Sequence, residues 1–168
     1  MKSMRRMMAI MLVLGVWAAA LCSAEIKKGD KAPNFTMRLS TGEKITLSSM
    51  LDKPVLLHFW ATWCPPCKKE LPEMDALAKK LASQGTAAKM HFLAVCTSDT
   101  DKNRADFMKK NKYTFSGGTD EKAEIGIKYG IQGIPTSILI DKDGTVLNVA
   151  VGMMTSAQLK EFVKGYED

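Results

Sequence analysis

The chain has 168 residues, a length that predicts one domain with a substantial hydrophobic core. It contains 24 basic and 18 acidic residues, a formal net charge of +6. Three of the basic residues, Lys2, Arg5 and Arg6, lie near the start, so the other 21 stand against all 18 acidic residues and leave a net charge of +3. So small an excess argues against nucleic acid as a partner.

The first 24 residues have the pattern of a secretory signal peptide. Basic residues precede an apolar run over 7–21, and small residues lead up to a cleavage point after residue 24. The apolar run is shorter than the roughly 20 residues of a membrane-spanning helix. Lipoprotein processing at Cys22 is less favoured, because Leu21 stands where such signals carry a small residue. We therefore expect a periplasmic or otherwise extracytoplasmic domain over 25–168, with lipid or membrane anchoring as the second choice.

Strand and helix patterns alternate after residue 25, and a hairpin and a helix end the chain. This order predicts an α/β fold with a mixed sheet and helices on both faces. The predicted elements are a hairpin of 35–39 with 43–47, a buried strand over 55–60, a helix over 66–83, a strand over 90–95, a helix over 101–110 with Ala105, Phe107 and Met108 inward, a short strand over 113–115, a short helix capped by Asp120 and reaching Tyr129, a hairpin of 137–141 with 146–151, and a helix after the capping box that Thr155 opens.

Cys64 and Cys67 lie between the strand over 55–60 and the helix over 66–83. Unpaired N–H groups and the helix dipole at such a junction favour an anion, so Cys64 is expected to be the nucleophilic thiolate. Cys67, about one turn further on, would be the resolving thiol that closes a Cys64–Cys67 disulfide. Pro66 suits the first helical position, where no backbone donor is needed.

Other uses of the cysteines are less favoured. A zinc site would need two more Cys or His ligands at close spacing, and no remaining Cys or His residues pair up in that way. A structural disulfide over so short a loop would stabilise little. Cys96 ends the strand over 90–95 and is expected to be a buried small hydrophobe, or else a third sulfur near the pair at the same sheet edge.

The motifs Trp-Cys-Pro-Pro-Cys over 63–67, Gly-Ile-Pro-Thr over 133–136 and Asp-Lys-Asp-Gly over 141–144, in this order, resemble a thioredoxin-fold protein. The Gly-Asp-x-Ala-Pro-x-Phe segment over 29–35 and the leader resemble the TlpA/ResA-like branch of extracytoplasmic thiol–disulfide oxidoreductases. The resemblance covers 29–166. It implies a single thioredoxin-like domain, with a mixed sheet flanked by helices on both faces and an added N-terminal β-hairpin.

The resemblance also implies functional residues around the cysteine pair. Pro135 would be cis and lie against the two cysteines, and the Ile134 backbone would pair with an extended substrate segment. Glu70 matches a glutamate linked to proton handling near the second thiol, although the helix dipole alone also favours an acidic residue early in a helix. The residues assigned to substrate contact are Trp63, Pro65, Pro66 and Ile134.

His58 departs from the wider family pattern. It stands six residues before Cys64, where ordinary thioredoxins carry a buried aspartate. A neutral buried imidazole could exchange a proton with Cys67 near neutral pH. It could equally be a hydrogen-bonded core residue without such a role, so the proton relay stays open for this chain.

Together these features predict an exported thiol–disulfide oxidoreductase that reduces disulfides in extracytoplasmic proteins. The resemblance suggests apocytochrome c cysteines as one substrate. No flavin or nicotinamide fingerprint is present, so no cofactor is expected and a membrane or periplasmic thiol partner must recharge the pair. Two alternatives stay open: a disulfide-donating oxidase of the same fold, and a non-catalytic copper-binding module that uses Cys64, Cys67 and a histidine.

Overall fold

The computed structural model describes residues 25–167, so the predicted signal peptide lies outside the described residues. A five-stranded sheet with the order β5-β4-β3-β6-β7 forms the centre, and β1 and β2 form a separate two-stranded sheet. The strands are β1 (Thr36–Arg38), β2 (Lys44–Thr46), β3 (Val55–Trp60), β4 (His91–Thr97), β5 (Gly117–Asp120), β6 (Thr136–Ile140) and β7 (Val146–Val151). The helices are the 3₁₀ turns η1 (Leu47–Met50) and η2 (Gly85–Ala87), and α2 (Pro65–Gln84), α3 (Asp101–Asn111), α4 (Glu124–Lys128) and α5 (Ser156–Phe162).

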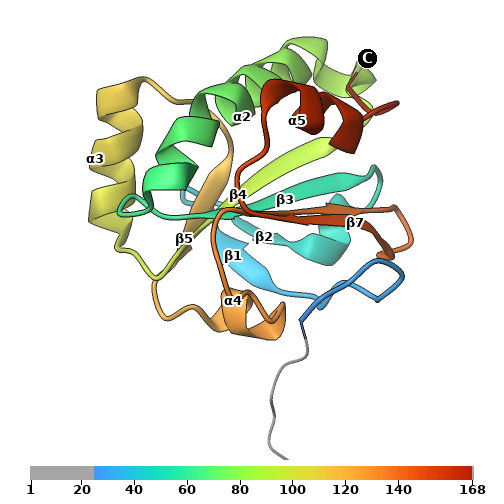
Figure 1. The fold of residues 1–168 in the computed structure, drawn as a ribbon, viewed down its shortest axis with the longest axis horizontal. Coiled ribbons are helices and arrows are strands. Elements are labelled where there is room, and N and C mark those ends of the chain that lie inside the picture. Colours follow the sequence, from blue (N-terminus) through green and yellow to red (C-terminus); the bar gives the residue numbers. More distant parts are fainter. Residues whose placement is uncertain (1–24, 168) are drawn as a thin grey trace, which may run out of the picture.

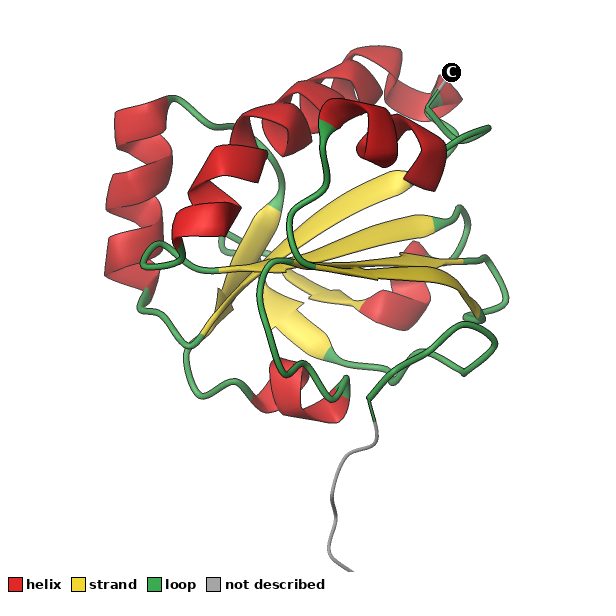
Figure 2. Cartoon of the chain, viewed as in Figure 1, coloured by secondary structure: helices red, strands yellow, loops and turns green. Residues whose placement is uncertain are grey.

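The predicted mixed sheet with helices on both faces is confirmed. Helices α2, α3 and α5 lie on one face, and the short α4 lies on the other with the β1–β2 hairpin (Figures 1 and 2). Side chains of β3 alternate between the two faces, as the pleat of a strand requires. Leu56 and Trp60 join the core under α2, whereas Leu57 and Phe59 join the core under the hairpin.

The strand pairing brings three loops to one edge of the sheet. β3 and β4 are parallel and end level, since Trp60 pairs with Cys96. The loops that follow these two strands therefore start side by side. β6 runs antiparallel to β3 and begins at Thr136, which pairs with Phe59. The loop over 131–135 consequently reaches the same edge.

The hairpin packs closely against the sheet through β5. Leu39 forms a bridge with Gly118. A Cβ atom on Gly118 would collide with the carbonyl oxygen of Arg38, and one on Gly117 would collide with that of Ala94. This close approach of three backbones therefore requires the two glycines at the start of β5.

Two predictions near α3 are wrong. The segment over 113–115 is a loop, because the rings of Tyr113 and Phe115 pack into the aromatic cluster under α2 and α3 instead of forming a ladder. In α3, Ala105 is exposed and Arg104 is the buried residue. The guanidinium of Arg104 can be buried because Asp101 and Thr119 accept its hydrogen bonds.

Candidate active site

The start of α2 holds the two cysteines of the predicted redox motif. Cys64 is the N-cap of α2, and Pro65, rather than the expected Pro66, occupies the first helical position. Cys64 and Cys67 form a disulfide with a Cα–Cα distance of 5.3 Å. The Cys67 N–H donates to Cys64 Sγ at 3.2 Å. After reduction, the same donor and the dipole of α2 would stabilise a thiolate on Cys64.

The loop before β6 lies against this disulfide. The peptide bond between Ile134 and Pro135 is cis, as the resemblance implied. The carbonyl oxygen of Ile134 is 3.6 Å from Cys64 Sγ. Gly152 N–H donates to the carbonyl of Pro135 at 2.8 Å, which ties the loop to the segment after β7. The Ile134 N–H has no acceptor within residues 25–167.

A groove of about 450 Å³ opens beside Cys64. Its walls come from the start of α2, the end of β4, helix α4 and the loop over 131–134, and no lining residue is charged. All four residues assigned to substrate contact line it, namely Trp63, Pro65, Pro66 and Ile134. No sequence pattern indicated the wall that α4 provides. Ile127 of α4 is 61% exposed and Trp63 is 57% exposed, so the groove presents unusually accessible apolar surface.

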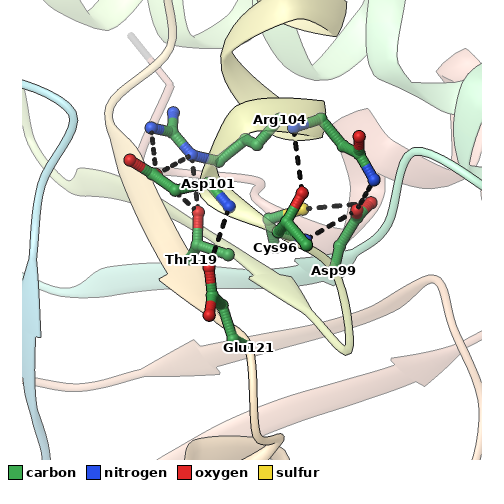
Figure 3. A network of polar contacts seen from close by, with 8 residues as sticks. Cys96, Asp99, Asp101, Arg104, Thr119 and Glu121 are labelled. Carbon is green, nitrogen blue, oxygen red and sulfur yellow. Dashed lines mark hydrogen bonds and ion pairs between the residues drawn. The ribbon is translucent and has the colours of Figure 1, made fainter.

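Cys96 is a free, buried thiol at the end of β4. It belongs to the same apolar core as Cys64 and Cys67, but its Sγ faces Asp99 Oδ2 at 3.8 Å (Figure 3). Burial raises the pKa of this thiol to about 12, and the charge of Asp99 adds to the effect. Cys96 is therefore protonated at neutral pH and a poor nucleophile.

His58 is completely buried on the face of β3 that carries α2. Its Nδ1 is 2.9 Å from Ser137 Oγ, and its ring stacks on Phe92 with a centroid distance of 6.4 Å. The Nε2 atom has no partner among the described residues, and no hydrogen bond there joins His58 to Cys67. Burial lowers the pKa of His58 to about 3, so the ring is neutral under ordinary conditions.

Glu70 lies one turn after Cys67 in α2 and is only 2% exposed. Its Oε1 accepts the Met154 N–H at 3.0 Å, and its Oε2 has no partner within residues 25–167. Burial raises the pKa of this carboxyl, although the Met154 hydrogen bond opposes the rise. The first turn of α2 contains no acidic residue, so the helix dipole does not account for Glu70.

The histidines do not join the cysteines. His91 pairs with Asp52 at 2.8 Å, at the start of β4 and so at the end of the sheet opposite the disulfide. Among residues 25–167, no three His, Cys, Asp or Glu side chains are grouped to hold a metal ion. The same part of the chain contains no helix of the length and apolarity that crossing a membrane requires.

Comparison with known proteins places this site in a family. The AhpC/TSA family matches residues 28–149. The thiol-disulfide oxidoreductase ResA of Bacillus thuringiensis subsp. konkukian is 39% identical over 136 residues, which cover 81% of this chain and 76% of the relative. The sporulation thiol-disulfide oxidoreductase A of Bacillus subtilis is 35% identical over 156 residues, or 92% of this chain and 93% of the relative.

Solved structures have the same fold. The crystal structure of a putative thiol:disulfide interchange protein DsbE from Chlorobium tepidum has a TM-score of 0.74 and 30% identity, and the match covers 86% of this chain and 100% of that one. StoA from Bacillus subtilis gives a TM-score of 0.64 and 33% identity, with 79% and 98% covered. The chain therefore belongs to the AhpC/TSA family of thioredoxin-fold proteins, in the TlpA/ResA-like branch of thiol–disulfide oxidoreductases.

Proposed function

We propose that this protein reduces disulfides in other exported proteins. The observation that supports it most is the position of Cys64, which caps α2, accepts the Cys67 N–H and lines an uncharged groove beside the cis-proline loop. These features stabilise an attacking thiolate and leave room for a partner chain. Export is supported by the leader pattern over residues 1–24.

Catalysis begins from the reduced pair. The Cys64 thiolate attacks one sulfur of the substrate disulfide, the substrate S–S bond breaks, and the other substrate sulfur leaves as a thiolate. Cys67 then loses its proton and attacks Cys64 Sγ. This step forms the Cys64–Cys67 disulfide and releases the second substrate thiolate, so two electrons have passed from the protein to the substrate.

Glu70 is the proposed acceptor for the proton of Cys67. It follows Cys67 by one helical turn, it has an unpaired buried oxygen, and burial raises its pKa, which makes its carboxylate a stronger base. His58 has an unpaired Nε2 on the same side of the sheet and is the second candidate. Its pKa of about 3 makes it the weaker base of the two.

The substrate segment is proposed to bind in an extended conformation. The free N–H of Ile134 can pair with its backbone by strand addition, while Trp63, Pro65 and Pro66 contact its side chains. Resemblance to the TlpA/ResA-like branch favours apocytochrome c cysteines as one such substrate. After each turnover the oxidised pair needs two electrons, and we propose a membrane or periplasmic thiol protein as their source.

The reduction potential of the purified protein tests the direction of exchange. It is measured against a dithiothreitol or glutathione series, with a Cys96→Ala variant in parallel. A value near about −270 mV supports the reductase, whereas one near about −120 mV replaces it with the disulfide-donating oxidase. Absence of a reversible Cys64–Cys67 couple would contradict both, and stoichiometric copper binding that is lost in Cys64→Ala would then favour the metal module.

A further inference from the structure

Two loops at the reactive edge of the sheet are joined by three hydrogen bonds. The N–H and the hydroxyl of Thr62, two residues before Cys64, both donate to Oδ2 of Asp99, at 2.8 and 2.6 Å. The indole N–H of Trp63 donates to the carbonyl of Ser98 at 2.9 Å. The loop after β4 therefore holds the segment that carries the nucleophile.

Asp99 is fixed from its other side by the first turn of α3. Its Oδ1 accepts the Thr100 N–H at 2.8 Å and the Asn103 side-chain N–H at 3.0 Å. Burial would raise the pKa of Asp99, but these bonds and those from Thr62 outweigh it, so the pKa is lowered. The group remains a carboxylate at neutral pH, with both oxygens available as acceptors.

The backbone next to Asp99 has an unusual conformation. Ser98 has a φ of 52°, in the left-handed region that residues with a side chain seldom adopt. This conformation directs the Ser98 carbonyl to the Trp63 indole, while the next residue, Asp99, binds Thr62. The strain is thus located where the loop meets the redox segment.

We propose that Asp99 is a positioning residue for the redox centre. Through Thr62 it fixes the segment before Cys64, so that the Trp63 ring forms a wall of the groove next to the reactive sulfur. The inference rests on the proposed role of that groove in binding protein disulfides. Trp63 is 57% exposed, and its indole N–H bonds to the loop that Asp99 ties to Thr62, so loss of Asp99 should loosen that wall.

Asp101 provides a matched control. It lies in the same first turn of α3, and its Oδ1 accepts bonds from Arg104 and Thr119 (Figure 3). Within residues 25–167, no hydrogen bond joins Asp101 to Thr62 or Trp63. If Asp99 only stabilised α3, replacement of either aspartate would have the same effect on catalysis.

The first experiment compares Asp99→Asn with Asp101→Asn. In Asp99→Asn the new amide N–H faces either the donors of Thr62 or those of Thr100 and Asn103, so one of these two sets of bonds is lost. We expect its KM for insulin disulfides to rise about tenfold, because misplaced binding groups cost rate even when the reacting atoms are intact. Its rate with the small reagent 5,5′-dithiobis(2-nitrobenzoic acid) should stay within about twofold, since that reagent does not need the groove. Asp101→Asn should stay within about twofold for both substrates.

Thr62 and the Trp63 indole supply readouts that do not depend on α3. Thr62→Val removes the hydroxyl bond to Asp99 while keeping the shape of the side chain, and it should reproduce part of the rise in KM. Thr62→Ser keeps both bonds to Asp99, so its KM should equal that of the wild type. Proton exchange at the Trp63 indole N–H, followed by NMR, should be faster in Asp99→Asn than in Asp101→Asn.

Equal KM values and equal indole exchange in the two aspartate variants would overturn the inference. If Asp99→Asn does not fold, Thr62→Val and Thr62→Ser decide it, and identical KM values for these two would overturn it. A wild-type protein that reacts with the small reagent but not with insulin would instead count against the proposed function. The indole exchange would still show whether Asp99 holds Trp63.

Discussion

On the face of the sheet under α2, α3 and α5, the core surrounds both cysteines and includes buried polar atoms without partners. On the face under the hairpin and α4, the largest polar side chain, Tyr129, donates its hydroxyl to the carbonyl of Pro33 at 2.8 Å. Within residues 25–167, every unpaired buried side-chain atom belongs to the α2 side: His58 Nε2, Trp60 Nε1, Glu70 Oε2 and Gln84 Oε1.

An unpaired buried polar group costs about 1–3 kcal/mol of stability. The α2 side therefore accepts a loss of stability, part of it at Glu70 beside the redox pair, and the hairpin side has no such unpaired atom within residues 25–167. Substitutions on the two faces should accordingly affect different quantities. Those on the α2 side should change the chemistry or the pH dependence of stability, and those on the hairpin side should change stability without changing the redox chemistry.

The largest effect is expected from Cys67→Ala. Without the resolving thiol, turnover of a protein disulfide should fall at least about a thousandfold, and the mixed disulfide on Cys64 should accumulate. Non-reducing gel electrophoresis and mass spectrometry of the adduct check this. Cys96→Ala is the control and should turn over normally, because Cys96 bonds to neither sulfur of the pair. Unchanged turnover by Cys67→Ala would mean that another group resolves the intermediate.

Phe35→Ala should have the largest effect on stability. Phe35 is 3% exposed and its ring centroid is 6.0 Å from that of Tyr129, in the core under the hairpin. Loss of a buried ring costs about 3–5 kcal/mol in urea unfolding. The reduction potential of the folded variant should match the wild type. A shifted potential would show that the two faces of the sheet are energetically coupled.

His58→Leu should remove part of the loss of folding stability that occurs at acid pH. The pKa of His58 falls from 6.5 to about 3 on burial, so the unfolded chain binds a proton that the folded chain rejects. Wild-type stability should then be complete above pH 6.5 and fall as the pH drops from 6.5 toward about 3. The slope from this group is at most about 1.4 kcal/mol per pH unit.

The leucine variant should lack that slope and lose about 1 kcal/mol at pH 7.5, where Ser137 has lost its partner. Urea midpoints at pH 4.5 and 7.5 measure both quantities. The same pH slope in variant and wild type would show that His58 accepts a proton in the folded state.

Glu70→Gln should change stability in the opposite direction. Burial raises the pKa of Glu70 above 4.5, so the folded chain holds its proton more tightly and loses stability as the pH rises from 4.5 through the raised value. The amide removes the buried charge, and its oxygen can still accept the Met154 N–H. The variant should gain about 1 kcal/mol at pH 7.5, a Tm increase of about 2–4 °C.

The same variant should slow the Cys67 step if Glu70 accepts its proton. Stopped-flow resolution of a preformed mixed disulfide measures that rate. A variant that is less stable and resolves at the wild-type rate would remove Glu70 from the proposed mechanism.

Much of the fold could be predicted from local patterns. The strand β3, with six consecutive buried residues, and the capping box of α5 both have signals within a few residues. The start of β5 has no such signal. Gly117 and Gly118 are required there because backbone segments from elsewhere in the chain lie too close for a Cβ atom. The burial of Arg104 could not be predicted for a similar reason, because it depends on a hydrogen bond to Thr119, which lies in β5.

The site likewise has parts that local patterns predict and parts that depend on tertiary packing. The cysteine pair and the cis-proline stand in contiguous motifs and could be found in the sequence. The bonds between Thr62 and Asp99 depend on the register that pairs Trp60 with Cys96, and sequence patterns do not specify that register. The wall of the groove formed by Ile127 depends equally on where the short α4 packs.

The glycines of β5 determine how the β1–β2 hairpin could be transferred to another protein. Because the Arg38 backbone lies directly on Gly118, the hairpin is fitted to one position of the sheet and is not an independent appendage. Grafting residues 35–47 onto a thioredoxin scaffold with a side chain at that strand position would force the two apart. A successful transplant would have to carry the glycine with it, which makes a residue more than 70 positions downstream part of the same module.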